Sequence, residues 1–144
     1  AEVYQALESG VVDGQENSFS NTYSQKYHEV QKTILETNHG VLDYMVVVNE
    51  KWWDGLPADI KKGLSEAMHE ATILNNQIAK QKNDDARAAI LASSTANSKH
   101  AKIIKLTDAE LAEWKKAMEP VYKRFEADIG ADLIKAAASH SNKK

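Results

Sequence analysis

The chain has 144 residues, the size of one ordinary domain, and 42% of them are hydrophobic, which is enough to supply a core. The net charge is -3, and no basic block precedes Lys143 and Lys144, which argues against nucleic acid as a partner. The absence of cysteine excludes disulfides and thiolate metal sites. No apolar run approaches the roughly 18 residues that span a bilayer.

The first residues read as a helix. Val3, Ala6 and Leu7 fall on one helical face, and Gly10 is placed to end the helix in a left-handed conformation. The helical pattern starts at once, so no signal peptide is recognised. A start at Ala1 without an initiator methionine indicates a mature chain or a fragment, and we favour a fragment.

A polar cluster follows a short strand-like run. Val11 and Val12 are β-branched, and the next five residues, 13–17, are Asp, Gly, Gln, Glu and Asn. Polar residues at the carboxyl end of a sheet strand are typical of a binding site in α/β proteins. The alternative is that these side chains merely cap the end of a strand.

Three aromatic rings come next, at intervals of four residues. Phe19, Tyr23 and Tyr27 would lie along one side of a short helix, where they either pack in the core or form the wall of a pocket. Residues 30–37 then predict a strand. It ends at a second polar group, Asn38-His39-Gly40.

Residues 41–49 give the clearest strand pattern in the chain. Met45 to Val48 are continuously apolar, which predicts a strand covered on both faces. We expect this strand and Val11-Val12 to belong to different sheets. Residues 50–56 then predict one helical turn closed by Gly55, and Pro57 opens the next helix.

The longest predicted element is a helix of some 35 residues, beginning at about Ala58. Its apolar positions follow a 3-4-3 rhythm, and neither Gly nor Pro interrupts residues 64–96. Such a helix would be roughly 50 Å long, more than a small domain needs. Residues 75–85 are almost wholly polar. We interpret the helix as a strut whose middle bridges solvent between two buried ends, unbroken near Asn75.

After this helix, Thr107 and Glu110 form a capping box at the start of another helix, in which Pro120 predicts a kink or a break. A polar loop at residues 93–99 and a short strand at 101–106 are predicted before this helix, which Gly130 closes. A last helix at 131–138 and a frayed tail at 139–144 are predicted after it.

Catalytic constellations are missing from the sequence. Ile73 stands where a zinc-binding helix motif begun by His69-Glu70 would need its second histidine. Asp13 and Glu16 are an odd number of residues apart, so on a strand they would face opposite sides. The chain also lacks a glycine-rich phosphate loop and a nucleophile elbow. We therefore expect neither an enzyme nor a cofactor.

Taken together, these stretches resemble the solute-binding proteins of tripartite ATP-independent periplasmic (TRAP) transporters, most closely the DctP-like branch. The resemblance is collinear and covers the whole chain. It is carried by EVYQAL (2–7), GVVDGQEN (10–17), QKYHEVQK (25–32), TNHG (37–40), VVVN (46–49), WWDGLP (52–57) and MEPVY (118–122).

The resemblance implies the carboxyl-terminal half of a two-domain, periplasmic-binding-type α/β fold with a long strut helix. Residues 1–42 would be part of ligand-binding domain II. Residues 43–82 would be part of domain I, with the start of the long helix. Residues 83–144 would hold the end of the helix and return to domain II. Its implied function is periplasmic capture of an organic acid, often a C4-dicarboxylate, for a membrane permease.

The resemblance also implies which residues bind the ligand. Asn17 matches a position that contacts a ligand carboxylate, His39 matches one near the interdomain cleft, and Tyr44 is a third candidate; a hydrogen-bonded strand-end histidine is the alternative for His39. The family's carboxylate-clamping arginine would lie upstream, because Arg87 and Arg124 do not match it. Ser18 stands where the family usually has proline, which implies a less rigid loop.

A second interpretation is a helical structural or interaction module that dimerises through the long helix. A fragment would expose the apolar faces meant for its missing half, and this favours self-association. Without the clamping arginine, the chain by itself is also expected to bind dicarboxylates poorly.

Overall fold

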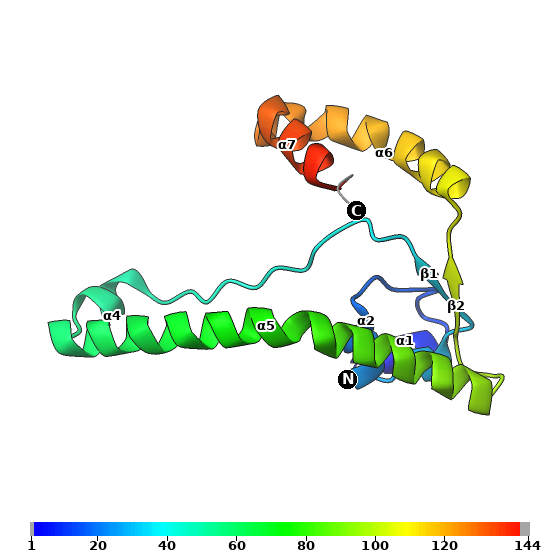
Figure 1. Ribbon diagram of the computed structural model, residues 1–144, viewed down its shortest axis with the longest axis horizontal. Helices are drawn as coiled ribbons and strands as arrows, with labels where there is room; N and C mark the ends of the chain where they lie inside the picture. Colours follow the sequence, from blue (N-terminus) through cyan, green and yellow to red (C-terminus); the bar gives the residue numbers. More distant parts are fainter. Residues whose placement is uncertain (1, 142–144) are drawn as a thin grey trace. The chain divides into compact units, whose positions relative to one another are not determined.

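The computed structural model describes residues 2–141 and divides at Ile104 into two compact units. Figure 1 shows the elements in chain order. They are α1 (Glu2–Glu8), α2 (Phe19–Ser24), α3 (Tyr27–Val30), β1 (Thr33–Glu36), α4 (Glu50–Asp54), α5 (Ala58–Ala96), β2 (Lys102–Lys105), α6 (Asp108–Ile129) and α7 (Ala131–Ser141). None of the helices within residues 2–141 is long and apolar enough to cross a membrane.

Two residues with positive φ punctuate the first helices. Gly10, at φ 73°, follows α1 as the sequence predicts. Lys26, at φ 61°, separates α2 from α3, so the three aromatic rings do not share one helix. Tyr27 is buried, whereas Tyr23 is 44% exposed.

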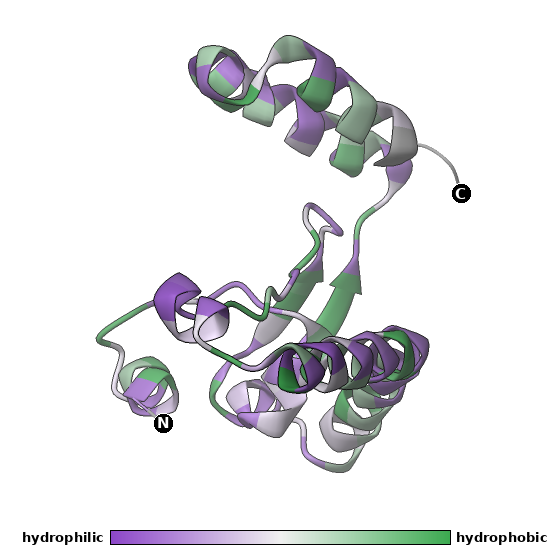
Figure 2. Ribbon diagram, turned by 90° about the vertical axis from the view of Figure 1, so that its left-hand side faces the viewer, coloured by the Kyte–Doolittle hydropathy of each residue, from purple (hydrophilic) through white to green (hydrophobic). Residues whose placement is uncertain are grey.

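Strands β1 and β2 form a two-stranded sheet and confirm the strands predicted at residues 30–37 and 101–106. The backbone N–H of Lys102, the first residue of β2, donates to the carbonyl of Lys32, which precedes β1, at 3.0 Å. Figure 2 shows both strand arrows pointing the same way. This parallel pairing agrees with a helical crossover connection, which α5 supplies.

The strands predicted at Val11-Val12 and at residues 41–49 are wrong. The Val11 and Val12 backbone N–H groups donate to the Ala6 carbonyl, at 2.9 and 3.3 Å, in the turn that ends α1. Residues 41–49 lack the neighbouring strand that would satisfy their backbone groups, since no strand within residues 2–141 pairs with them. Val47 is 81% exposed, so the sheet and the two covered faces expected there are also absent. β-branched composition describes which surface a segment suits, not whether that surface is present.

Helix α5 is one unbroken element of 39 residues, about 58 Å long at roughly 1.5 Å per residue. It confirms the predicted strut, and Pro57 precedes its first residue. Residues 75–82 are exposed, as expected for a solvent-bridging middle. Only the carboxyl-terminal end is buried: Ile60 and Leu64 are exposed, which corrects the expectation of two buried ends. The helix also continues to Ala96, so the predicted loop is shorter.

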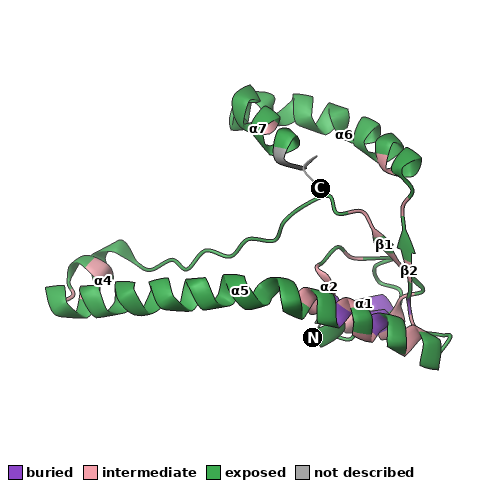
Figure 3. Cartoon of the chain, viewed as in Figure 1, coloured by how far each residue is buried: buried purple, intermediate pink, exposed green. Residues whose placement is uncertain are grey.

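The core lies where the last third of α5 packs against α2, which in turn contacts α3, and α3 contacts α1 (Figure 3). Ile90 is fully buried, and Ala86, one turn earlier, is 6% exposed. Among residues 2–139, the other buried ones are Leu7, Thr22, Tyr27, His28 and Ala101.

The second unit begins with the predicted capping box, in which Thr107 accepts from the Glu110 backbone N–H and Glu110 accepts from Thr107. The hydrogen bonds from the Thr107 backbone and hydroxyl lower the pKa of Glu110. Pro120 removes one helical hydrogen bond but causes no break in α6. Gly130, at φ 96°, ends α6 as predicted. Helix α7 continues to Ser141, so residues 139–141 are not the predicted tail, whose remainder lies outside the described residues.

The core predicts a sharp contrast between two neighbouring residues of α5. Ile90→Ala should lower the free energy of unfolding by roughly 2–4 kcal/mol, because it opens a cavity in the packed end of the helix. Leu91→Ala is the matched control, since Leu91 is 39% exposed and should cost less than about 1 kcal/mol. Urea denaturation followed by circular dichroism measures both. Equal losses for the two variants would contradict this placement of the core.

Candidate functional site

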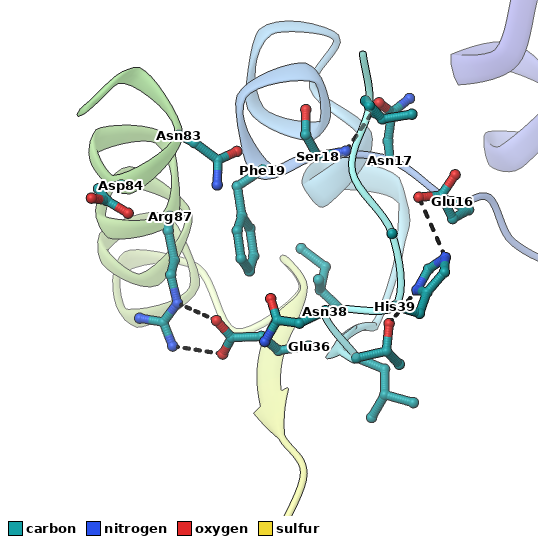
Figure 4. A pocket seen from close by; sticks show the side chains of 15 residues that line it. Glu16, Asn17, Ser18, Phe19, Glu36, Asn38, His39, Asn83, Asp84 and Arg87 are labelled. Atoms are coloured by element: carbon teal, nitrogen blue, oxygen red, sulfur yellow. Dashed lines mark hydrogen bonds and ion pairs between the residues drawn. The ribbon is translucent and has the colours of Figure 1, made fainter. Parts of the chain in front are cut away.

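The site is a pocket of about 280 Å³ formed by three segments of the first unit (Figure 4). Residues 16–19 supply one wall and residues 34–40 the other. Asn83, Asp84 and Arg87 of α5 lie between the walls, and Leu42 completes the lining. Residues far apart in the sequence therefore meet at one hollow.

Asn17 lines this pocket just before α2. Its side-chain oxygen accepts two hydrogen bonds, from the Ser18 backbone N–H at 3.1 Å and from the Asn21 side-chain amide at 2.7 Å. These bonds fix which end of the amide is the acceptor. The Asn17 Nδ2 group makes no hydrogen bond to any residue within 2–141, so both of its N–H groups remain available as donors.

Ser18 stabilises this wall through hydrogen bonds of its backbone N–H and its hydroxyl. A proline at this position could not make them, because it has neither group. Its hydroxyl accepts from the Asn21 backbone N–H at 3.3 Å and caps the first turn of α2. It also lies 3.0 Å from the Ser20 hydroxyl. Capping thus supplies local order at the position where the resemblance leads one to expect a proline.

His39 lies on the opposite wall, beyond the end of β1. Asn38, at φ 48°, turns the chain through a left-handed conformation that asparagine tolerates well. The His39 Nδ1 atom is 2.6 Å from the Thr37 hydroxyl, and its Nε2 atom is 3.7 Å from a Glu16 carboxylate oxygen. The ring therefore links both walls of the pocket.

Tyr44 does not line the pocket. Its hydroxyl accepts a long hydrogen bond, 3.5 Å, from the Asn21 amide that also donates to Asn17. The ring is 82% exposed and borders an open groove with Val46, Val48 and the first half of α5. Of the three predicted ligand-binding residues, the structure brings Asn17 and His39 to one pocket and connects Tyr44 through Asn21.

Arg87 is the residue that the sequence-based interpretation set aside. Its Nε atom donates to Glu36 at 3.1 Å and its Nη2 atom at 2.9 Å, a bidentate ion pair. These bonds raise the pKa of Arg87 and outweigh burial, which lowers it. The guanidinium also lies over the Phe19 ring, 5.7 Å from its centroid. A sequence signal existed, because Arg87 follows Ala86 and lies three residues before Ile90, at the edge of the buried face of α5.

The charge balance of the pocket is unfavourable to an anion. Three carboxylates line it, on Glu16, Glu36 and Asp84, against a single arginine whose fork Glu36 already occupies. The donors left for a ligand are neutral amide and hydroxyl groups and the His39 ring. A dianion gives up strong hydration on entering a site, so this pocket needs further positive charge to hold one.

Nothing in the described chain points to a resident metal. No group of three or more histidine, aspartate or glutamate side chains within residues 2–141 is arranged to hold a metal ion. The neutral donors of the pocket are suited to hydrogen-bonded recognition of a small polar molecule.

The chain belongs to the family of bacterial extracellular solute-binding proteins, family 7 (DctP), whose sequence model matches residues 1–128. Solute binding defines this family, which agrees with the expectation that the chain is not an enzyme. The resemblance to DctP-like proteins is therefore confirmed.

Several proteins of this family are similar to this chain. The C4-dicarboxylate-binding periplasmic protein DctP of Vibrio cholerae is 43% identical over 143 residues, which are 99% of this chain and 41% of that protein. DctP of Rhodobacter capsulatus is 46% identical over 136 residues, 94% of this chain and 39% of that protein. The chain thus spans about two fifths of the length of these relatives.

A crystal structure of a TRAP periplasmic solute-binding protein from Shewanella oneidensis with bound succinate matches with a TM-score of 0.89 and 44% identity. The match covers 99% of this chain and 45% of the other. A homologous structure from Pseudomonas aeruginosa with bound L-malate gives a TM-score of 0.76 and 34% identity, covering 90% and 44% of the two chains. These matches confirm the α/β, periplasmic-binding-type fold class.

Proposed function

We propose that this chain supplies one part of a periplasmic TRAP solute-binding protein, which captures an organic acid, preferably a C4-dicarboxylate, and delivers it to a membrane permease. The carrying observation is the match to the succinate-bound Shewanella oneidensis structure, at a TM-score of 0.89 and 44% identity. The relatives from Vibrio cholerae and Rhodobacter capsulatus are named as C4-dicarboxylate-binding and periplasmic, which supports the same solute class and compartment.

In this proposal Asn17 donates hydrogen bonds to a ligand carboxylate. Its orientation supports the role, because its oxygen is engaged by Ser18 and Asn21 and its Nδ2 group is left to donate. His39 faces the same pocket and binds the ligand from the opposite wall. Tyr44 acts at the edge of the site, through its bond to Asn21.

The charge that neutralises the dianion comes from outside this chain. Arg87 is held by Glu36, and the other carboxylates of the pocket repel an anion. A carboxylate-clamping arginine on a second part of the protein would balance the charge, as the family resemblance implies. A cleft with the neutral amide wall on one side and the arginine on the other satisfies the ligand.

We further propose that residues 1–42 belong to ligand-binding domain II, residues 43–82 to domain I, and residues 83–144 to the return to domain II. The exposure of residues 41–49 supports a covering domain around them, since Val41, Val46 and Val47 are mostly exposed and no strand within residues 2–141 pairs with this run. The length of α5 also exceeds what one small domain requires.

The second candidate is association of the 144-residue chain with itself. The first half of α5 exposes an apolar stripe that includes Ile60, Leu64 and Met68, and residues 41–48 expose a run of apolar side chains and unpaired backbone. Surfaces of this kind favour pairing with a second copy. A swapped dimer built around the long helix is the simplest closed arrangement.

Asn17 is tested in the longest natural polypeptide that carries residues 1–144. Asn17→Ala should weaken succinate binding by roughly 1.5–3 kcal/mol, as expected for a hydrogen bond to a charged group. Asn17→Asp should weaken it at least as much, because Asp keeps the acceptor oxygen but replaces the donor with a negative charge. Calorimetric titration measures both. Asn75→Ala, on the exposed part of α5, is the control; unchanged affinity in both Asn17 variants would remove Asn17 from the site.

The 144-residue chain by itself should bind succinate or malate with a Kd of about millimolar or weaker, because its pocket lacks a free cation. A millimolar Kd corresponds to a binding free energy of only ~4 kcal/mol. Light scattering should give a mass above that of one chain. Leu64→Lys should shift the mass toward the monomer, whereas Glu66→Gln, on the opposite face of α5, should not. A monomeric chain with micromolar succinate affinity would contradict both parts of this expectation.

A further inference from the structure

Both walls of the pocket are attached to one turn of α5. Asn83, at the start of this turn, accepts the Ser20 backbone N–H with its side-chain oxygen at 3.2 Å. Arg87, one turn later, forms the bidentate pair with Glu36 and lies over Phe19. Figure 4 shows the guanidinium and Glu36 pointing toward each other from separate elements at one side of the pocket.

These contacts lie very near the proposed ligand-binding side chains. Phe19 is two residues beyond Asn17, and Glu36 is three residues before His39. The Glu36 side chain is only 14% exposed and that of Arg87 35%, so the pair is shielded and its two parallel bonds fix direction as well as distance. From α5, Arg87 thus contacts both walls, which also meet each other directly through Glu16 and His39.

We propose that Arg87 and Glu36 are positioning residues for solute binding: the pair sets the spacing between the Asn17 wall and the His39 wall and does not itself clamp the ligand. This inference rests on the proposed function. Two of the guanidinium's donor nitrogens are committed to Glu36, and the ring of Phe19 covers one of its faces. Breaking the pair detaches the end of β1, and with it the His39 wall, from α5, while the Asn17 wall keeps its Asn83–Ser20 bond. The donors of Asn17 and His39 then no longer converge on one carboxylate.

The proposal predicts an effect opposite to that of simple electrostatics. Glu36→Gln removes a negative charge from an anion-binding pocket, and Coulomb attraction alone would then tighten the binding of a dianion. If Glu36 acts through Arg87, the same change weakens binding instead. Asp84→Asn is the matched control, because Asp84 lines the same pocket and its carboxylate forms its ion pair with Lys80 of its own helix rather than with Arg87.

The experiment measures succinate affinity by calorimetry in the longest natural polypeptide that carries residues 1–144. Glu36→Gln should raise Kd by about tenfold or more, the size of the loss expected when a charged hydrogen bond is misplaced. Asp84→Asn should lower Kd, because it removes a negative charge from the pocket and leaves the Arg87–Glu36 pair intact. Arg87→Lys keeps the positive charge but should also weaken succinate binding, since a lysine cannot make the bidentate fork. The double variant Glu36→Gln/Arg87→Lys should bind no more weakly than either single variant.

Tighter or unchanged binding by Glu36→Gln, in a polypeptide whose wild type binds succinate, would overturn the positioning role alone. A wild type that binds no C4-dicarboxylate would instead overturn the proposed function. Circular dichroism at the temperature of the titration establishes that each variant is folded. If Glu36→Gln does not fold, Phe19→Leu replaces it: loss of the ring under the guanidinium should also weaken succinate binding, and unchanged Kd would overturn the proposal.

Discussion

One turn of α5, from Asn83 to Arg87, is the constraint on which the pocket depends. It fixes the start of α2 through the Ser20 backbone and the Phe19 ring, and the end of β1 through Glu36. The same end of the helix carries Ala86 and Ile90 into the core. Burial of one face of α5 therefore holds the polar face next to it, and the packed core positions the pocket.

This attachment has a chemical consequence. The arginine of the pocket is used to build its walls, and what remains for a ligand is an amide, hydroxyl groups and an imidazole. Neutral donors give direction to a carboxylate but offset little of its desolvation. The proposed function therefore assigns the neutralising cation to a part of the protein outside these two walls, and the chain spans about two fifths of the length of its relatives.

Local signals in the sequence were sufficient for some elements. The apolar rhythm of α5, the capping box of Thr107 and Glu110, and the glycines that end α1 and α6 act over a few residues, so they predict the structure well. The strand expected at residues 41–49 failed because a strand depends on a neighbour, and no segment of the described chain supplies one. Composition could not reveal that absence.

The pocket was predictable only in part, for a similar reason. The polar groups after two apolar runs, together with the family resemblance, predict Asn17 and His39 as ligand-binding residues. Both residues line the pocket. Arg87 was set aside because its place in a helix did not match the family's clamp. Its pairing with Glu36, 51 positions earlier, is a tertiary contact that no local pattern encodes.

The central claim, that Asn17 presents its amide donors to a dicarboxylate, is tested most directly by following the Asn17 side-chain amide in nuclear magnetic resonance spectra. The measurement uses the longest natural polypeptide that carries residues 1–144, titrated with succinate. The account predicts that both Asn17 Nδ2 proton resonances shift in step with saturation, while those of exposed Asn75 stay in place. Saturable succinate binding that leaves the Asn17 amide resonances unmoved would contradict it.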